Sequence, residues 1–353
     1  MSTAQEFEKA VDQADTSVAS FEGHERSFIE KAQHYLHGNP AAVPLIVLIL
    51  SVIAFGLILG SKFFSAFTLT LILQQVAITG IIGAAQTLVI LTAGIDLSVG
   101  AIMVLSSVIM GQFTFRYGLP APIAILCGLA AGALMGWING VLVSYVKLPP
   151  FIVTLGTWSI FLAANFLYSA NETIRSQDIQ AQAPILQFFG QSVRIGGAVF
   201  TYGVIASVLL VALLWYVLNH TAWGRYVYAV GDDPEAAVLS GVPVRRILIQ
   251  VYMLSGLICA LAGWVLIGRL GSVSPTAGQF ANIESITAVV IGGISLFGGR
   301  GSIFGMFFGA LIVGVFSLGL RLIGTDPQWT YLLIGVLIIV AVAIDQWIRK
   351  VAG

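Results

Sequence analysis

The stretch GDDPEAAVLSGVPVRR, residues 231–246, is polar and lies between two long apolar runs. Asp233 is a good helix N-cap, because its side-chain oxygen can accept a hydrogen bond from a backbone N–H that has no partner within the helix. Pro234 suits the first helical position, where no N–H is needed. Gly241 favours the left-handed conformation that ends a helix, and Pro243 prevents its continuation. The stretch therefore predicts a very short, well-delimited helix.

A helix this short is unstable alone, because nucleation costs more free energy than its few hydrogen bonds return. It must therefore pack against something. One alternative is the rim of its own protein. The other is a groove in a cytoplasmic partner, since the helix surface mixes small and acidic residues, which suits docking better than insertion into lipid.

The rest of the chain is strongly apolar. Of its 353 residues, 58% are hydrophobic and only 9% are charged, whereas soluble domains carry about 25% charged residues. This composition predicts an all-α polytopic membrane protein embedded in the lipid bilayer. The formal net charge is zero and no basic patch occurs, so nucleic acid is not an expected partner. Cys127 and Cys259 both lie in apolar runs, which favours core positions over a disulfide.

About ten membrane spans are expected, because a bilayer core of about 30 Å requires roughly 20 apolar helical residues. They are residues 43–60, 68–92, 97–113, 121–146, 150–170, 201–219, 249–270, 284–297, 303–323 and 329–347. The third and eighth are short for a full crossing. An even number of spans places both termini on one side of the membrane.

Charge predicts which side this is. With the N-terminus inside, ten of the sixteen Lys and Arg residues fall on the inner side, which favours cytoplasmic termini. Residues 1–40 form a polar N-terminal tail. Within it Ser27 and Glu30 fit a capping box, so a short interfacial helix is one interpretation of the tail and a lead-in without function is the other.

Two glycine-interrupted segments, 88–111 and 289–314, indicate broken or short helices in each half of the chain. Such breaks at matching places in two halves point to the inner pathway of a transporter. Close helix packing alone also selects small residues, so the pattern has a purely structural alternative.

Three motifs in the chain resemble those of one family of membrane transport proteins. Glu235-Ala236-Ala237 followed after three residues by Gly241 resembles the EAA-type loop of bacterial ABC importer permeases. The lead-in, Gly224-Arg225 and Ala229-Val230-Gly231, looks like that of the ribose/xylose/fructose branch. The segments TAGIDLSVG at 92–100 and IGGISLFGGRGS at 291–302 agree with it. The similarity runs from residue 43 to the C-terminus, and the whole most resembles a fructose permease.

The resemblance implies a type II ABC importer-like fold in a permease domain at 41–353, with a cytoplasmic coupling loop at 221–248. It implies a monosaccharide cargo, fructose by preference and otherwise ribose or xylose, crossing the bacterial inner membrane. Expected partners are an ABC ATPase seated on the 233–242 helix, a periplasmic sugar-binding protein and a second permease copy. The expected ATPase-coupling residues are Gly224, Arg225, Asp232, Asp233, Pro234, Glu235, Ala236, Ala237, Gly241 and Val242.

A sugar pathway requires hydrogen-bonding groups inside the spans. The candidates are Gln74, Gln75, Gln86, Asp96, Asn139, Trp158 and Asn165, together with Thr87, Thr154 and Tyr252. Each has the alternative of an interhelical hydrogen bond, worth about 0.6 kcal/mol. Asp96 has the further alternative of capping a helix that starts at Leu97, with Gly94 permitting the bend, and Glu284 is expected to cap the eighth span in the same way.

No motif in the sequence predicts catalysis. None of the five lysines fits a phosphate-binding Gly-x4-Gly-Lys-[Ser/Thr] loop, so ATP is expected to bind to a partner subunit and no cofactor is expected in this chain. The four histidines lie mostly in the N-terminal tail and form no HExxH motif, so no metal site is expected either. An ion-coupled secondary transporter is the alternative. It requires titratable residues inside the spans, where Asp96 is nearly the sole candidate. An intramembrane enzyme would require paired catalytic residues, which the spans lack.

Overall fold

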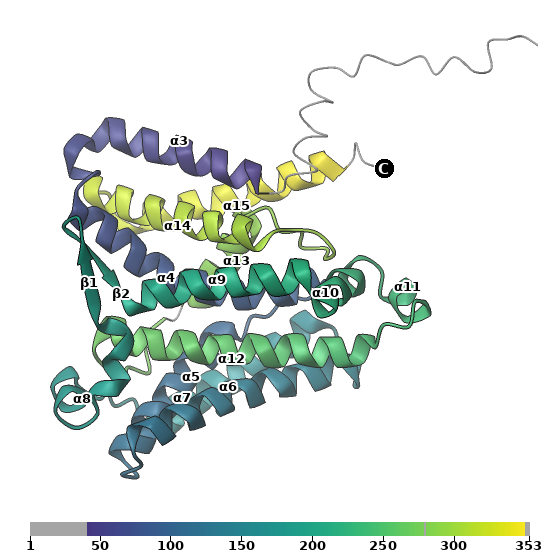
Figure 1. Cartoon of the computed structure of the whole chain (residues 1–353), viewed down its shortest axis with the longest axis horizontal. Coiled ribbons are helices and arrows are strands. Elements are labelled where there is room, and N and C mark those ends of the chain that lie inside the picture. The colour runs from purple at the N-terminus through teal and green to yellow at the C-terminus, as the bar shows by residue number, and fades with distance from the viewer. Residues whose placement is uncertain (1–40, 279, 350–353) are drawn as a thin grey trace, which may run out of the picture.

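The computed structural model describes residues 41–278 and 280–349, and the predicted interfacial helix within residues 1–40 lies outside them. In the described part the chain is a bundle of helices with a single two-stranded hairpin (Figure 1). Seven helices are long and apolar enough to cross a membrane, and three shorter apolar helices accompany them. An all-α polytopic membrane protein is therefore confirmed, with apolar helices at all ten predicted places.

The seven long helices are α3 (Ala42–Leu59, extended by the 3-10 turn η2, Gly60–Lys62), α4 (Ala66–Leu91), α6 (Ala121–Ser144), α7 (Pro150–Ser169), α9 (Tyr202–His220), α12 (Val244–Leu270) and α14 (Ile303–Ile323). The shorter apolar helices are α5 (Val99–Phe115), α13 (Ala281–Ile291) and an apolar stretch, Gln328–Val340, within α15 (Pro327–Arg349). The third and eighth spans are short, as predicted.

Helices α4 and α12 form the centre of the bundle. From Val76 to Leu91 every residue of α4 is buried, and α12 packs against α4, α5 and α6. Small residues allow this packing: a Cβ atom on Gly136 of α6 would overlap the backbone carbonyl of Tyr252 in α12. Close backbone approach of this kind is how membrane helices gain packing energy without a hydrophobic driving force.

The periphery is apolar and exposed, as a lipid-facing surface should be. Leu57 on α3 and Leu167 on α7 are 82% and 84% exposed. Few residues of these two helices are buried inside the described chain. Their outward faces fit contact with the bilayer.

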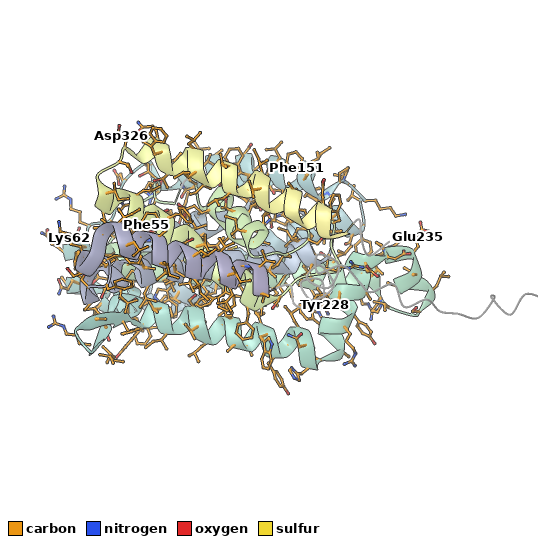
Figure 2. All side chains as sticks on the ribbon, turned by 90° about the horizontal axis from the view of Figure 1, so that it is seen from above. Phe55, Lys62, Phe151, Tyr228, Glu235 and Asp326 are labelled. Atoms are coloured by element: carbon orange, nitrogen blue, oxygen red, sulfur yellow. The ribbon has the colours of Figure 1, made fainter. Side chains whose placement is uncertain are left out.

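The bundle has two distinct ends. At one end the short helix α11 (Pro234–Leu239) projects beyond all the spans, so we call it the α11 end (Figure 1). At the other, which we call the hairpin end, lie α8 (Ser176–Gln182), the 3-10 helix η3 (Pro184–Gly190) and the antiparallel strands β1 (Ser192–Ile195) and β2 (Ala198–Thr201). Lys62 and Asp326 lie at the hairpin end and Glu235 at the α11 end (Figure 2). The start of α3 and the end of α15 both point toward the α11 end (Figure 1).

Two predicted boundaries are displaced. The connection at 221–248 is mostly helical, because α10 (Ala222–Asp232) and α11 occupy it and α12 begins at Val244. The eighth span begins at Ala281 and ends at Ile291, since the chain turns at Gly292 and Gly293 has a φ of 74°. Glu284 therefore lies inside the first turn of α13 and does not cap it; Phe280 occupies the N-cap position, without a side-chain cap.

Candidate functional site

Helix α11 is delimited as the sequence predicts. The Asp233 carboxylate accepts hydrogen bonds from the backbone N–H groups of Glu235 (2.9 Å) and Ala236 (3.0 Å), which makes it the N-cap. Gly241 has a φ of 82°, in the left-handed region that closes a helix at little cost for glycine. Val242 then donates its N–H to the Ala237 carbonyl at 2.9 Å.

The two sides of α11 differ. Ala237 is only 4% exposed and belongs to the main hydrophobic core, which partly buried Val242 and Val244 extend. Val238 and Leu239, by contrast, are 59% and 89% exposed. The helix thus packs on the rim of its own protein through one side and presents an apolar pair, Val238 and Leu239, on the other.

Helix α10 joins this element to the spans. Gly224 stands where α9 turns into α10, and a Cβ there would overlap the backbone carbonyls of Val217 and Leu218. Its N–H donates to the Thr221 hydroxyl at 3.1 Å, which caps α10. The remaining predicted coupling residues are exposed on α10 and α11, namely Arg225, Asp232, Pro234, Glu235 and Ala236.

The end of α10 contacts two other segments at a point that we call the glycine junction: Leu91, Gly231, Gly298, Gly299 and Gly301. The Gly299 N–H donates to the Leu91 carbonyl at the end of α4 (3.0 Å). A Cβ on Gly231 would overlap that same carbonyl oxygen. Gly298 and Gly299 have φ values of 85° and 70°, which side chains disfavour.

Tyr228 ties α10 to the same junction. Its hydroxyl donates to the Gly301 carbonyl at 3.0 Å. Burial raises the pKa of Tyr228 above its usual value, so the hydroxyl keeps the proton that it donates. Gly298 also lies against Gly231 and Ala93, so segments from the motifs at 92–100, 231–241 and 291–302 meet at the glycine junction.

Asp96 lies beside this junction, between α4 and α5, and is 1% exposed. Its Oδ1 accepts from both the N–H (2.7 Å) and the hydroxyl (2.6 Å) of Ser98. Ser98, not Asp96, occupies the N-cap position, because α5 begins at Val99 and not at Leu97. The predicted N-cap role of Asp96 is therefore wrong in register: its carboxylate stabilises the turn that precedes the cap.

The bend before Asp96 also differs from the prediction. The positive φ belongs to Ala93 (59°), not to Gly94. Gly94 is needed for space, because a Cβ there would lie 2.7 Å from the Tyr252 hydroxyl oxygen and 3.0 Å from a Val89 methyl carbon.

The predicted pathway residues separate into three places. Gln86, Asp96 and Asn139 are buried in the core. The Asn139 amide donates to the Ser98 hydroxyl at 2.9 Å, and the Gln86 amide pairs with the Asp96 backbone at 2.9 and 3.2 Å in the orientation that satisfies both groups. Thr87 and Thr154 are buried as well, and the Thr154 hydroxyl donates to the Ile95 carbonyl at 2.9 Å. The bonds of Gln86, Asn139 and Thr154 join separate segments, which is the structural role that was the alternative, whereas the Thr87 hydroxyl donates to Gly83 within α4. A pathway role for these residues stays a prediction.

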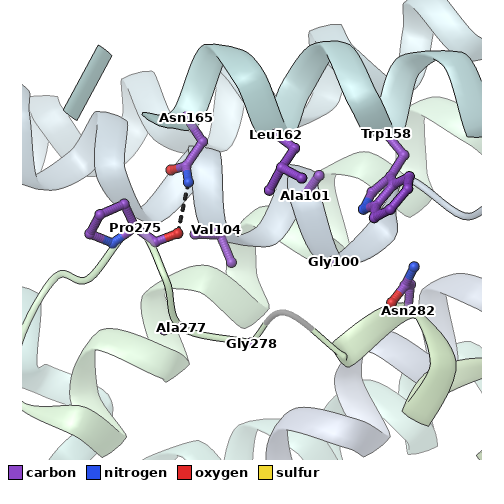
Figure 3. Close-up of a pocket in the computed structure, with 10 residues that line it drawn as sticks. All are labelled: Gly100, Ala101, Val104, Trp158, Leu162, Asn165, Pro275, Ala277, Gly278 and Asn282. Carbon is purple, nitrogen blue, oxygen red and sulfur yellow. Dashed lines mark hydrogen bonds between the residues drawn. The ribbon is translucent and has the colours of Figure 1, made fainter. Parts of the chain in front are cut away.

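Trp158 and Asn165 of α7 form the second place, a pocket against the segment that leads into α13 (Figure 3). The Asn165 amide donates to the Pro275 carbonyl at 2.8 Å, the dashed bond in Figure 3. Asn282, which sequence reasoning did not single out, also lines this pocket. Its volume is about 20 Å³, enough for about one water molecule and too small for a sugar.

Gln74 and Gln75 form the third place, on the part of α4 nearer the hairpin end. Both border hollows between α4 and α14. Among the described residues no group of three or more His, Cys, Asp or Glu side chains is placed to bind a metal ion.

Broken helices in both halves, a helical element projecting from one end and a junction that links it to the breaks define a polytopic transport protein. The chain belongs to the permease family described as the branched-chain amino acid transport system / permease component, whose model matches residues 68–342.

Three relatives are informative. The fructose import permease protein of Rhizobium meliloti is 79% identical over 350 residues, 99% of this chain and 97% of the relative. The ribose import permease protein of Bacillus subtilis (strain 168) is 39% identical over 289 residues, 82% and 88% of the two chains. The D-allose transport system permease protein of Escherichia coli (strain K12) is 35% identical over 304 residues, 86% and 91% of the two. No solved structure matches the chain.

Proposed function

We propose that this chain is the transmembrane permease subunit of an ABC importer that moves fructose across the bacterial inner membrane. The near-full-length similarity to a fructose import permease, at 79% identity, supports the choice of sugar. Ribose is the first alternative, because ribose import permeases are similar at a lower identity.

The observation that carries the mechanism is the two-sided α11. Ala237 anchors the helix to the bundle, so a force applied to its other side reaches the spans. Exposed Val238 and Leu239 supply the apolar contact that a helix presents to a partner's groove. A separate ATPase docks there, binds the ATP and moves α11 when it closes.

The α11 end then faces the cytoplasm, together with both termini, and the hairpin end faces the periplasm. A sugar-binding protein delivers cargo at the hairpin end, over α8, η3 and the β1–β2 hairpin. Two copies of the permease, one for each ATPase, complete the transporter.

The test is the variant Leu239→Glu in the complex of permease, ATPase and binding protein. A charge in the centre of an apolar contact removes a hot-spot interaction worth about 2 kcal/mol or more, so we expect about thirtyfold weaker ATPase binding and a matching loss of fructose uptake. Ile195→Glu is the control, because Ile195 is similarly apolar and 62% exposed but lies at the hairpin end. It should leave ATPase co-purification unchanged.

Two results contradict the proposal. If Leu239→Glu retains the ATPase and transports at the normal rate, α11 is not the docking site. If the permease reconstituted alone accumulates fructose without nucleotide, it is a secondary transporter.

A further inference from the structure

A cavity of about 440 Å³, lined by both polar and apolar side chains, lies between α4, α13, α14 and α15. We call it the hairpin-end cavity, because it lies in the part of the bundle nearer that end. Its polar lining comprises Gln75, Glu284, Thr287, Ser317, Arg321, Thr325 and Thr330. A smaller hollow of about 60 Å³ shares three of these residues and adds Arg269.

The charged groups around this cavity are held in place by neighbours. The Arg269 guanidinium donates to the Gln75 side-chain oxygen at 2.7 Å, so the Gln75 amide nitrogen is left to donate elsewhere. The Thr79 hydroxyl lies 3.4 Å from both Glu284 Oε2 and the Gln75 carbonyl oxygen and can donate to either. Ionisable groups among membrane helices are costly unless they pair or face a polar cavity, so their presence here indicates a site that holds polar material.

The chemistry of the lining favours a neutral, hydroxyl-rich molecule. The charged residues that line the cavity are one carboxylate, Glu284, and one guanidinium, Arg321, so a cation would meet the like charge of Arg321. An anion would meet the Glu284 carboxylate in the wall. Hydroxyl groups both donate and accept, which matches a wall of one acceptor, guanidinium donors and several Thr and Ser hydroxyls.

The volume of the cavity also suits a monosaccharide. Ligand pockets typically measure about 300–1,000 Å³, and the hairpin-end cavity falls in this range, whereas the pocket of Trp158 and Asn165 holds about 20 Å³ (Figure 3). Ile283 and Ile334 add apolar surface for the C–H groups of a sugar ring.

The cavity is also connected to the glycine junction. Helix α4 carries Gln75 in its wall and ends at Leu91, whose carbonyl accepts from Gly299. The segment that contains Gly298, Gly299 and Gly301 joins α13 to α14, the helices of Glu284 and Arg321. Three walls of the cavity therefore lead to the junction, which the end of α10 contacts.

We propose that the hairpin-end cavity binds the transported monosaccharide, with Glu284 accepting and Arg321 donating hydrogen bonds to its hydroxyl groups. This proposal rests on the proposed function, because it locates the cargo of that importer within the chain. Movement of α11 changes the shape of the cavity through the glycine junction, so ATP-driven closure of the ATPase changes the affinity of the cavity for the sugar.

Cysteine protection tests the site in the full-length permease in lipid nanodiscs. Ser317→Cys in a Cys127→Ser background leaves Cys259, which is fully buried, as the other thiol. Fructose should slow modification of Cys at position 317 by a water-soluble maleimide, and glycerol at equal concentration should not. Thr330→Cys provides a second reporter if the first variant folds poorly.

Glu284→Gln provides the specific test. The substitution replaces a charged acceptor by a neutral amide oxygen and so weakens the hydrogen bond, which should raise the fructose concentration needed for half-protection about tenfold. The control Asp178→Asn makes the same chemical change in exposed α8 and should leave protection unaltered.

Three outcomes overturn the proposal: no protection by fructose in a permease whose complex transports it, equal protection by glycerol, or stronger protection by fructose 6-phosphate than by fructose. Uptake by the wild-type complex is measured in parallel. Its absence contradicts the proposed function, whereas uptake without protection contradicts only this site.

Discussion

The glycine junction and the hairpin-end cavity differ in how tightly the same helices pack. At the junction, backbone meets backbone: Gly299 bonds to Leu91, and Gly231 lies so close to the same carbonyl that no Cβ fits. In the cavity, side chains of α4, α13 and α14 leave about 440 Å³ unfilled. The same helices pass through both places.

The contrast shows how one set of helices can both transmit force and hold cargo. Where side chains are absent, nothing can change rotamer, so displacement of one segment displaces the next. Where space remains, a small tilt of the walls alters the distances that a ligand needs. Rigid contact at one end and open volume at the other fit the proposed ATPase-driven movement of α11.

The largest effect is expected for Gly231→Ala, which inserts a methyl group into the junction. Overpacking against backbone, which cannot rotate away, should cost about 3 kcal/mol. We expect much less folded protein and a correspondingly lower melting temperature, measured by fluorescence-detected size-exclusion chromatography after heating. Gly156→Ala is the matched control, because no atom lies within 4 Å of a Cβ placed there. Equal melting temperatures for the two variants would contradict the tight packing at the junction.

An intermediate effect is expected at Asp96, where a side chain and not the backbone holds the segment beside the junction. Asp96→Ala leaves the N–H and hydroxyl of Ser98 without their buried acceptor, at a cost of about 2 kcal/mol. Asp96→Asn keeps the accepting oxygen and removes a buried charge whose Oδ2 has no hydrogen-bond partner in the described part of the chain. The melting temperature should therefore be lower for Asp96→Ala than for the wild type and unchanged for Asp96→Asn. If the Asp96→Asn variant folds normally but transports no sugar, the Asp96 carboxylate has a role in the sugar pathway.

The smallest effect is expected for Tyr228→Phe, which removes one hydrogen bond to the Gly301 carbonyl. A single neutral hydrogen bond contributes about 1 kcal/mol, so folding should change little. Uptake per ATP hydrolysed should nevertheless fall, because α10 loses one link to the junction. Tyr226→Phe, on the exposed side of α10, should alter neither quantity. Identical coupling ratios for the two variants would show that the backbone contacts suffice.

Local features of this fold were predictable from sequence because their causes are local. Asp233, Pro234 and Gly241 delimit α11 through contacts within a few residues, and span positions follow from runs of apolar residues. The predicted N-cap positions of Asp96 and Glu284 are wrong because tertiary contacts, and not local sequence, decide where α5 and α13 begin. Ser98 is already fixed by Asn139 from α6, and α13 starts three residues before its acidic residue.

The site was less predictable, since its parts are distant in the chain. Nothing near Gly231 reveals that its neighbour is the Leu91 carbonyl. Gln75 is a pathway candidate from sequence, but Ser317, Arg321 and Thr330 are single polar residues in or at the ends of apolar spans, which no local pattern connects with Gln75. Their common cavity exists only once α4, α13, α14 and α15 are packed together.

The Leu91 carbonyl has one more implication. The last carbonyls of a helix have no partner within it, and here one of them is satisfied by an amide from a segment more than two hundred residues later in the chain. Inside a membrane, leaving that oxygen bare would be costly, and water is the sole substitute. A conformation that opens the bundle at the α11 end must therefore either move the end of α4 and the 298–301 turn as one rigid body or admit water to the gap between them.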